Sequence, residues 1–261
     1  LPMYQAIAES KNTSAVWLLD KLGIQRGISK LEDFGISIGE ADENLGAIAL
    51  GGMSKGVTPV QLASAYTTFV NEGVRTQARF ITKIVDATGA VIVDNTKPKT
   101  NRVTTAAVAE EMTSMLMGVY ADGGTGASAQ PSNGMVIAGK TGTTELDRET
   151  GYIKSQWMVG YTPDLVVATW LGYDKTNEIY NLNNAGKTMA NLYSAEMGAL
   201  LSISPQTEFA VAAAEETYDS GIINGLKNGL DEFMNDMGSF GQSLGEGSKK
   251  LFDWANEAFG Q

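Results

Sequence analysis

The sequence predicts a mixed α/β fold built around an antiparallel sheet. Three strand-like stretches follow one another closely, at 135–138, 156–161 and 165–173. The last two are separated only by Thr162-Pro163-Asp164, a turn-forming triplet. Because strands joined by short turns pair with their neighbours in opposite directions, the sheet is expected to be antiparallel.

Helices are expected on both sides of these strands along the chain. The clearest begins after Thr58, a good N-cap, with Pro59 in the first turn, and ends before Gly73. The apolar residues between these points recur at helical spacing. Further helices are predicted at 3–9, 13–22, 104–120 and 187–201, and two short hairpin strands at 79–86 and 90–94.

Composition excludes several classes of function. The chain of 261 residues has a formal net charge of -11 and only 19 Lys and Arg, so a nucleic-acid partner is not expected. It contains no Cys and no His, which removes thiolate nucleophiles, disulfides and the usual zinc ligands. No metal and no cofactor is expected, and acid–base chemistry must use Lys, Ser, Tyr or carboxylates.

The chain is predicted to divide near Pro205. Residues 1–204 are expected to form one catalytic unit, and residues 205–261 an acidic, Gly-rich tail with ten acidic and three basic residues. The tail is interpreted as a flexible segment with short amphipathic helices, or as a segment that docks on another domain or a partner. No stretch approaches the roughly 20 apolar residues of a membrane-spanning helix. Together with a first residue other than Met, this indicates a piece of a longer protein whose signal or anchor lies upstream.

The strongest chemical signal is the run from Gly139 to Thr144, placed directly after the strand predicted at 135–138. Lys140 supplies a positive charge, and Thr141 and Thr143 supply hydroxyl donors for a carboxylate. Gly142 leaves room for a substrate backbone to approach, and the N–H that follows it can face a developing oxyanion. Alone, these residues would equally fit an ordinary strand with a surface lysine.

A second signal is Ser10-Lys11-Asn12, a polar break between two predicted helices. Its serine hydroxyl and asparagine amide can face one cleft. Serine and asparagine also favour any helix junction as caps, so this triplet matters only together with Lys140.

In this order, Ser10-Lys11-Asn12 and Lys140-Thr141-Gly142 resemble the second and third signature motifs, Ser-x-Asn and Lys-Thr-Gly, of penicillin-binding proteins and serine β-lactamases. The surrounding sequence is similar to the transpeptidase domains of class A penicillin-binding proteins and covers residues 1 to about 204. The similar segments, in family order, are 6–16, 50–59, 157–164 and 172–174.

The resemblance implies an antiparallel sheet flanked by helices and a D,D-transpeptidase that crosslinks peptidoglycan stem peptides ending in D-Ala-D-Ala. Ser10 would relay a proton to the departing amine, and Asn12 would bind the substrate amide. Lys140, Thr141 and Thr143 would bind the terminal carboxylate, and the Thr143 N–H would form half of the oxyanion hole. β-Lactams would be bound at the same site. Lys11, at the variable position, is expected to be solvated.

One departure from the family is decisive. The first family motif, Ser-x-x-Lys, carries the nucleophile, and no such pattern occurs in the 261 residues. The fold is therefore expected to be incomplete at its N-terminal side. The nucleophile is expected in an upstream half of the same domain, possibly a separate chain, and the isolated chain is expected to be inactive. The resemblance also implies a location on the extracytoplasmic face of the bacterial cell membrane, with a glycosyltransferase domain and an anchor upstream.

Two alternatives stay open at this point. A serine β-lactamase would carry the same motifs and release its acyl group rapidly. A non-catalytic module would use Lys140 and Thr143 to bind a peptide carboxylate without forming an acyl-enzyme. The residues preceding Leu1 distinguish these alternatives.

Overall fold

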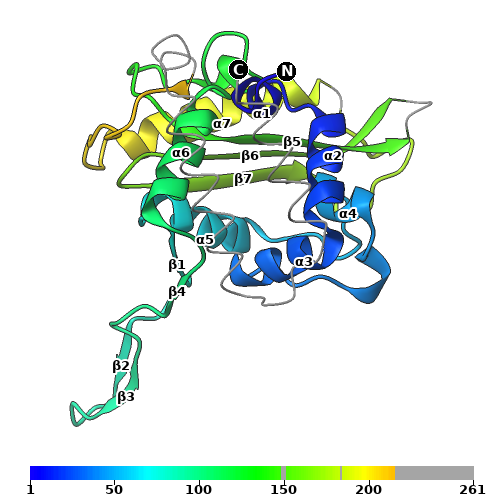
Figure 1. Ribbon diagram of the computed structural model, residues 1–261. Coiled ribbons are helices and arrows are strands. Elements are labelled where there is room, and N and C mark those ends of the chain that lie inside the picture. The colour runs from blue at the N-terminus through cyan, green and yellow to red at the C-terminus, as the bar shows by residue number, and fades with distance from the viewer. Residues whose placement is uncertain (148–150, 183, 215–261) are drawn as a thin grey trace.

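A three-stranded antiparallel sheet forms the centre of the molecule, as the sequence predicts (Figure 1). The computed structural model describes residues 1–147, 151–182 and 184–214. The strands lie in the order β5-β6-β7, so β5 has one open edge within the described residues. They are β5 (Ala138–Asp147), β6 (Tyr152–Tyr161) and β7 (Val166–Gly172).

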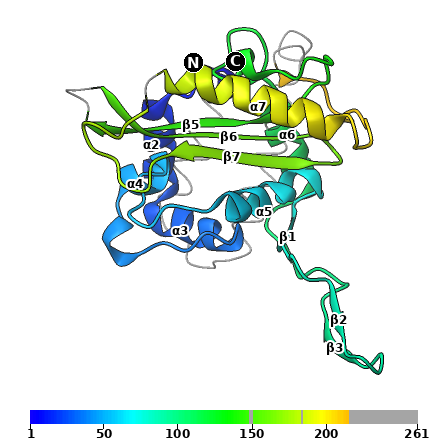
Figure 2. The ribbon, with the colours of Figure 1, turned by 180° about the vertical axis from the view of Figure 1, so that it is seen from behind.

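Helices pack on this sheet from more than one side (Figures 1 and 2). α7 packs on β6, α6 on β5, and α5 on β7. The Thr58 side chain accepts a hydrogen bond from the Gln61 N–H and forms a capping box, which confirms the predicted start of α5. The predicted helices are present with slightly different ends as α1 (Met3–Ala8), α2 (Asn12–Leu22), α5 (Pro59–Val70), α6 (Ala106–Met117) and α7 (Ala185–Leu201).

Among the described residues, four helical segments were not predicted: α3 (Ile24–Asp33), η1 (Glu40–Asp42), α4 (Leu45–Leu50) and η2 (Ala127–Ala129). α3 carries a glycine near its centre, which weakens a helix signal in the sequence. In the fold, a Cβ at Gly27 would lie 2.5 Å from Cδ1 of Leu19 on α2, so the Leu19 side chain would have to shift to admit a larger residue. The glycine that weakens the helix signal therefore lies at a close contact between α3 and α2.

A narrow arm extends away from the body (Figures 1 and 2). Its base is an antiparallel pair that was not predicted, and its outer part is the predicted hairpin. The first hairpin strand is shorter than the predicted 79–86, because only residues 83–85, near its C-terminal end, pair with the second strand. The four strands are β1 (Val74–Thr76), β2 (Lys83–Val85), β3 (Val91–Asp94) and β4 (Thr100–Arg102).

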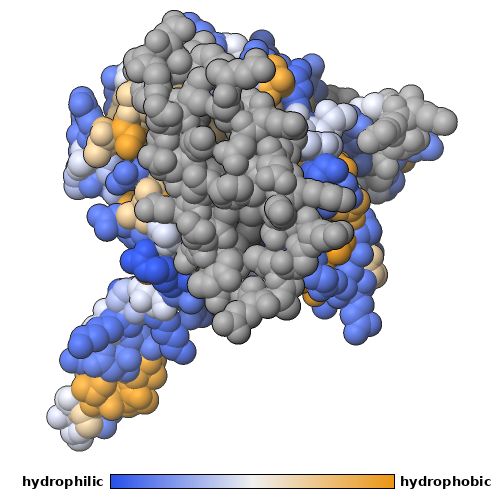
Figure 3. Space-filling view, viewed as in Figure 1, coloured by the Kyte–Doolittle hydropathy of each residue, from blue (hydrophilic) through white to orange (hydrophobic). Residues whose placement is uncertain are grey.

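The arm carries an exposed apolar patch, visible towards its far end in Figure 3. Phe80 is 87% exposed and Ile92 is 64% exposed. A lone two-stranded hairpin has no second layer that could cover such side chains, so they stay in solvent in this structure. The other large apolar side chains exposed on the arm are Ile81, Ile84, Val85 and Val91.

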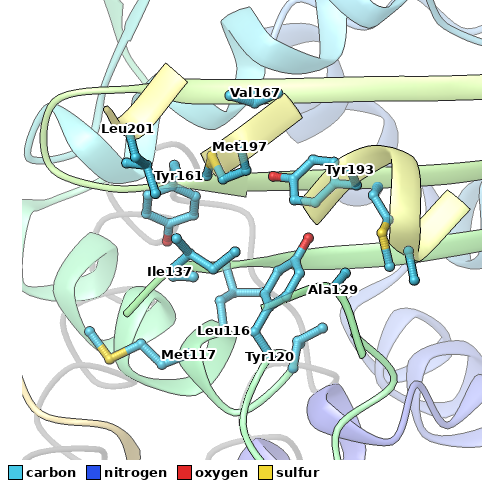
Figure 4. Close-up of a cluster of buried hydrophobic side chains, with 14 of the residues drawn as sticks. Leu116, Met117, Tyr120, Ala129, Ile137, Tyr161, Val167, Tyr193, Met197 and Leu201 are labelled. Carbon is cyan, nitrogen blue, oxygen red and sulfur yellow. The ribbon is translucent and has the colours of Figure 1, made fainter. Parts of the chain in front are cut away.

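The main core lies between the sheet and helices α6 and α7 (Figure 4). Two buried tyrosines satisfy their hydroxyl groups within it, as burial of polar groups requires. Tyr120 donates to the Val159 carbonyl at 2.9 Å, and the Tyr161 hydroxyl lies 2.9 Å from Thr113 Oγ1. Gly160 leaves room for the core, since a Cβ there would lie 2.3 Å from Tyr193 Oη. This packing fixes β6, and β6 in turn positions β5.

Residues 205–214 pack on the body of the domain. The Asp164 carboxylate accepts hydrogen bonds from the Thr207 N–H at 3.0 Å and from the Thr207 hydroxyl at 3.1 Å. The Phe209 ring meets the Tyr161 ring edge-on, with centroids 5.8 Å apart. The domain boundary at 204/205 stays a prediction, and the predicted tail helices lie outside the described residues. In the described part of the chain, no helix combines the length and apolar character needed to cross a membrane.

Candidate active site

The Lys-Thr-Gly run lies inside strand β5 and not after a strand, which corrects the predicted strand ending at residue 138. Pairing with β6 extends the strand through the run, with Thr141 opposite Met158 and Thr143 opposite Gln156. Because side chains alternate along a strand, Thr141 and Thr143 lie on the same face of β5. The run therefore sits along the open edge of the described sheet.

Two glycines of this run lie in different surroundings. A Cβ at Gly139 would lie 2.0 Å from the Val159 carbonyl oxygen, so no other residue fits against β6 at that position. A Cβ at Gly142 would lie 3.3 Å from Trp157 Cβ, a tight contact that a small shift can relieve. Gly139 is thus required by packing, whereas at Gly142 a side chain would be crowded only by Trp157.

Ser10 lies in the turn between α1 and α2, where the sequence predicts a break. Its φ of 55° is left-handed, a conformation that costs free energy for a residue with a Cβ. The turn is held by the Lys11 N–H, which donates to the Ala6 carbonyl at 2.9 Å. Strain of this kind persists only where the surrounding structure enforces it, and it is common at functional sites.

The structure brings Ser10 and Lys140 into direct contact. Lys140 Nζ donates to Ser10 Oγ at 2.6 Å and to the Thr141 carbonyl at 3.0 Å. Burial removes water from the ammonium group and lowers the pKa of Lys140 from 10.5 to about 8. At neutral pH the side chain is therefore mostly charged, and it loses its proton more readily than a surface lysine.

The other residues of the Ser-x-Asn triplet are exposed. Asn12 is the first residue of α2 and lies two positions beyond Ser10. Lys11 forms an ion pair with Glu9 at 2.7 Å, so its charge is paired with that carboxylate.

Both threonines of the run have partners that sequence reasoning missed. The Thr125 and Thr141 hydroxyls lie 2.7 Å apart, and Thr143 Oγ1 donates to Gln156 Oε1 at 3.1 Å. Gln156 is only 6% exposed, whereas Thr125 and Thr143 are exposed. The one sequence signal for Thr125 is its position between two glycines in a loop, and Gln156 has no signal other than its place in a strand.

This arrangement can bind an anion and move a proton. One ammonium group and the hydroxyls of half-buried Thr141 and exposed Thr143 line one strand edge, and the ammonium contacts a serine hydroxyl from a separate turn. A carboxylate is the natural complement of such a donor set. Among the described residues, no group of three or more His, Cys, Asp or Glu side chains is placed to hold a metal ion.

Comparison with known proteins identifies the family. The profile described as "Penicillin binding protein transpeptidase domain" matches residues 1–195. The chain is 40% identical over 217 residues to penicillin-binding protein 2a of Streptococcus pneumoniae serotype 2, which covers 82% of this chain. It is 39% identical over 191 residues to penicillin-binding protein 1F of Bacillus subtilis, which covers 73% of this chain. The chain belongs to the penicillin-binding protein transpeptidase family.

Its relatives place it among the class A members of that family. The structure of the penicillin-binding protein PonA1 from Mycobacterium tuberculosis is similar, with a TM-score of 0.54 and 28% sequence identity over 65% of this chain and 44% of PonA1. The chain spans 29% of the length of the S. pneumoniae protein and 26% of the B. subtilis protein.

Proposed function

We propose that this chain forms part of the active site of a D,D-transpeptidase that crosslinks peptidoglycan stem peptides through an acyl-enzyme and is a target of β-lactams. The observation that carries the proposal is the 2.6 Å contact between Lys140 Nζ and Ser10 Oγ, beside the hydroxyls of half-buried Thr141 and exposed Thr143. It joins a positive charge, a proton carrier and hydroxyl donors at one accessible strand edge.

The proposed substrate has a terminal carboxylate, which the Lys140 charge attracts and the hydroxyls of Thr141 and Thr143 bind. To do so, Thr143 turns its single hydroxyl proton from Gln156 Oε1 to the carboxylate. Gly142 admits the substrate backbone alongside β5, and the exposed Asn12 amide binds the substrate's amide carbonyl. These contacts orient the peptide bond of the D-Ala-D-Ala end for attack, and orientation alone accounts for a large share of such rate enhancements.

In the first step, a serine oxygen attacks the carbonyl carbon of the penultimate D-alanine. The serine–carbon bond forms as the serine hydroxyl gives up its proton, the bond to the terminal D-alanine nitrogen breaks, and Ser10 relays a proton to that nitrogen. In the second step, an amine of a neighbouring stem peptide attacks the ester. A new amide bond forms, the serine–carbon ester bond breaks, and the proton that the amine loses returns to the serine. The Thr143 N–H stabilises the oxyanion that develops in each step.

The attacking serine is proposed to belong to a Ser-x-x-Lys motif in an upstream half of the same domain, because the 261 residues contain no such motif. That half is the proposed partner of this chain and supplies the second oxyanion donor. A bacterial location at the extracytoplasmic face of the cell membrane, with the anchor outside this chain, follows from the proposed substrate.

The proposal is tested by replacing Lys140 in the full-length protein that contains this chain. Lys140→Ala should lower the rate of acylation by a fluorescent penicillin by two or more orders of magnitude, because it removes the charge that binds the carboxylate and contacts Ser10. The matched control is Lys11→Ala, which removes an exposed lysine one residue from Ser10 and should leave the rate unchanged. A Lys140→Ala rate within about threefold of wild type, with the fold intact, would contradict the proposal.

A further inference from the structure

Thr125 closes a ring of contacts that joins three separate segments of the chain. Its N–H donates to the Ala8 carbonyl at 3.1 Å, two residues before Ser10. Its hydroxyl lies 2.7 Å from the hydroxyl of Thr141. Lys140, the residue before Thr141, in turn contacts Ser10 at 2.6 Å. The ring therefore runs from the α1–α2 turn to β5 and returns through the loop that follows α6.

The loop holds Thr125 in place by close backbone packing. A Cβ at Gly124 would lie 2.3 Å from the carbonyl oxygens of Gly118 and Val119, and a Cβ at Gly126 would lie 2.9 Å from the Tyr120 ring. The Gly126 N–H also donates to the Val119 carbonyl at 2.8 Å. With both neighbours packed against the end of α6, Thr125 has little freedom to move relative to β5.

We propose that Thr125 is a positioning residue that orients the Thr141 hydroxyl for binding the substrate carboxylate. The inference rests on the proposed function and deepens it. A carboxylate only accepts hydrogen bonds, so Thr141 must direct its single hydroxyl proton at the substrate. Thr141 then has lone pairs free to accept, and the Thr125 hydroxyl at 2.7 Å is placed to donate to one of them. Substrate binding thus selects the arrangement in which Thr125 donates to Thr141.

The backbone hydrogen bond from Thr125 to Ala8 is separate from the side-chain contact with Thr141. Because Thr125 is bonded to the residues that lead into Ser10, it also sets the distance between the α1–α2 turn and β5. Replacing only the hydroxyl group leaves this backbone bond intact. A side-chain change at Thr125 therefore isolates the orientation of Thr141 from the placement of Ser10.

The experiment measures penicillin acylation of the full-length protein with Thr125→Val, Thr125→Ser, Thr141→Val and the double variant Thr125→Val/Thr141→Val. Thr125→Val should acylate about 5- to 10-fold more slowly, the effect of one lost hydrogen bond, through weaker initial binding and not through a slower limiting rate. Thr125→Ser should restore the rate to within about twofold. The double variant should be no slower than Thr141→Val alone, because Thr125 acts through Thr141.

Ser128→Ala, an exposed hydroxyl removed from the same loop, is the matched control and should acylate like wild type. Thr125 is itself exposed, so the Val variant should keep the wild-type melting temperature. The inference is overturned if Thr125→Val acylates at the wild-type rate, if serine fails to restore the rate, or if the two threonine effects multiply. These results differ from failure of the proposed function, in which Lys140→Ala would acylate normally.

Discussion

Lys140 Nζ and Ser10 Oγ lie 2.6 Å apart although 130 residues separate them in sequence. The lysine is held by pairing of β5 with β6, and the serine by a strained turn between two helices. The contact therefore depends on the relative placement of a sheet and a helical layer. It links the two motifs that the sequence singled out.

The lowered pKa of Lys140 predicts how activity depends on pH. Burial brings the pKa of Lys140 to about 8, and the charged form is the one proposed to bind the carboxylate, so acylation should fall as pH rises through this value. Lys140→Arg keeps its charge because a guanidinium does not lose its proton in this range. The acylation rate of Lys140→Arg should stay constant between pH 7 and 10, whatever its value relative to wild type at neutral pH. An alkaline fall that is the same in both proteins would assign the titration to another group.

The same pKa shift has the opposite effect on stability. In the unfolded chain Lys140 has a pKa near 10.5, so between about pH 8 and 10.5 the unfolded state binds more protons than the folded state. The Lys140 contribution to folding stability should then rise with pH across this window, and the penalty of burying its charge should be largest below pH 8. Chemical unfolding of wild type and Lys140→Met at pH 7 and pH 10 measures this: the stability advantage of the Met variant should shrink at pH 10. An advantage that grows with pH would contradict the assignment.

Ser10 combines the proposed proton-relay hydroxyl with a strained backbone, so two substitutions should separate these features. Ser10→Ala and Ser10→Gly both remove the proton carrier and should reduce acylation similarly. Glycine accepts the left-handed φ of 55° without a Cβ penalty. The Ser10→Gly variant should therefore be about 1 kcal/mol more stable than Ser10→Ala and should unfold at a higher temperature. Equal melting temperatures would show that the turn is not strained in solution.

Gly139 should tolerate no side chain. A Cβ there would meet the Val159 carbonyl oxygen at 2.0 Å, so Gly139→Ala should force β5 away from β6 and cost about 1–3 kcal/mol or more. Gly52→Ala is the control, since nothing lies within 4 Å of a Cβ at that position. Thermal unfolding of the full-length variants tests the difference, and equal stability of the two would show that β5 pairs with β6 less closely than described.

The segment after α7 should stabilise the domain. Ending the protein after residue 204 removes the Thr207 bonds to Asp164 and the Phe209 ring contact with Tyr161, and the melting temperature should fall by several degrees. Ending it after residue 214 keeps both contacts, and penicillin acylation should be almost unchanged. Equal melting temperatures for the two truncations would contradict a stabilising role of residues 205–214.

The sequence predicted the sheet and most of the long helices, because these depend on local signals. It also singled out Ser10 and Lys140 as candidate site residues, but it did not predict their contact. Strand patterns, a capping Thr58 and two short motifs all follow from nearby residues. The full length of β5 was not predicted. Its glycines and lysine give a weak strand pattern, and the strand extends through them because it pairs with β6. Strand length here is set by tertiary pairing and not by propensity.

Thr125 and Gln156, the contact partners of Thr141 and Thr143, were also not predicted from the sequence. Each is identified only by a contact with a threonine at least 13 residues away. Thr125 depends on how two glycines pack a loop against α6, and Gln156 on the register that sets it opposite Thr143. Register and loop packing are long-range properties, so a residue whose role depends on them carries no local signature.

We propose that this chain completes an active site whose nucleophile lies outside its 261 residues. The most direct measurement is the location of the covalent adduct in the full-length protein after treatment with benzylpenicillin, determined by mass spectrometry of its peptides. We expect a penicilloyl group on the serine of an upstream Ser-x-x-Lys motif and none on any peptide from residues 1–261. An adduct on Ser10, or on any other serine of this chain, would contradict the account.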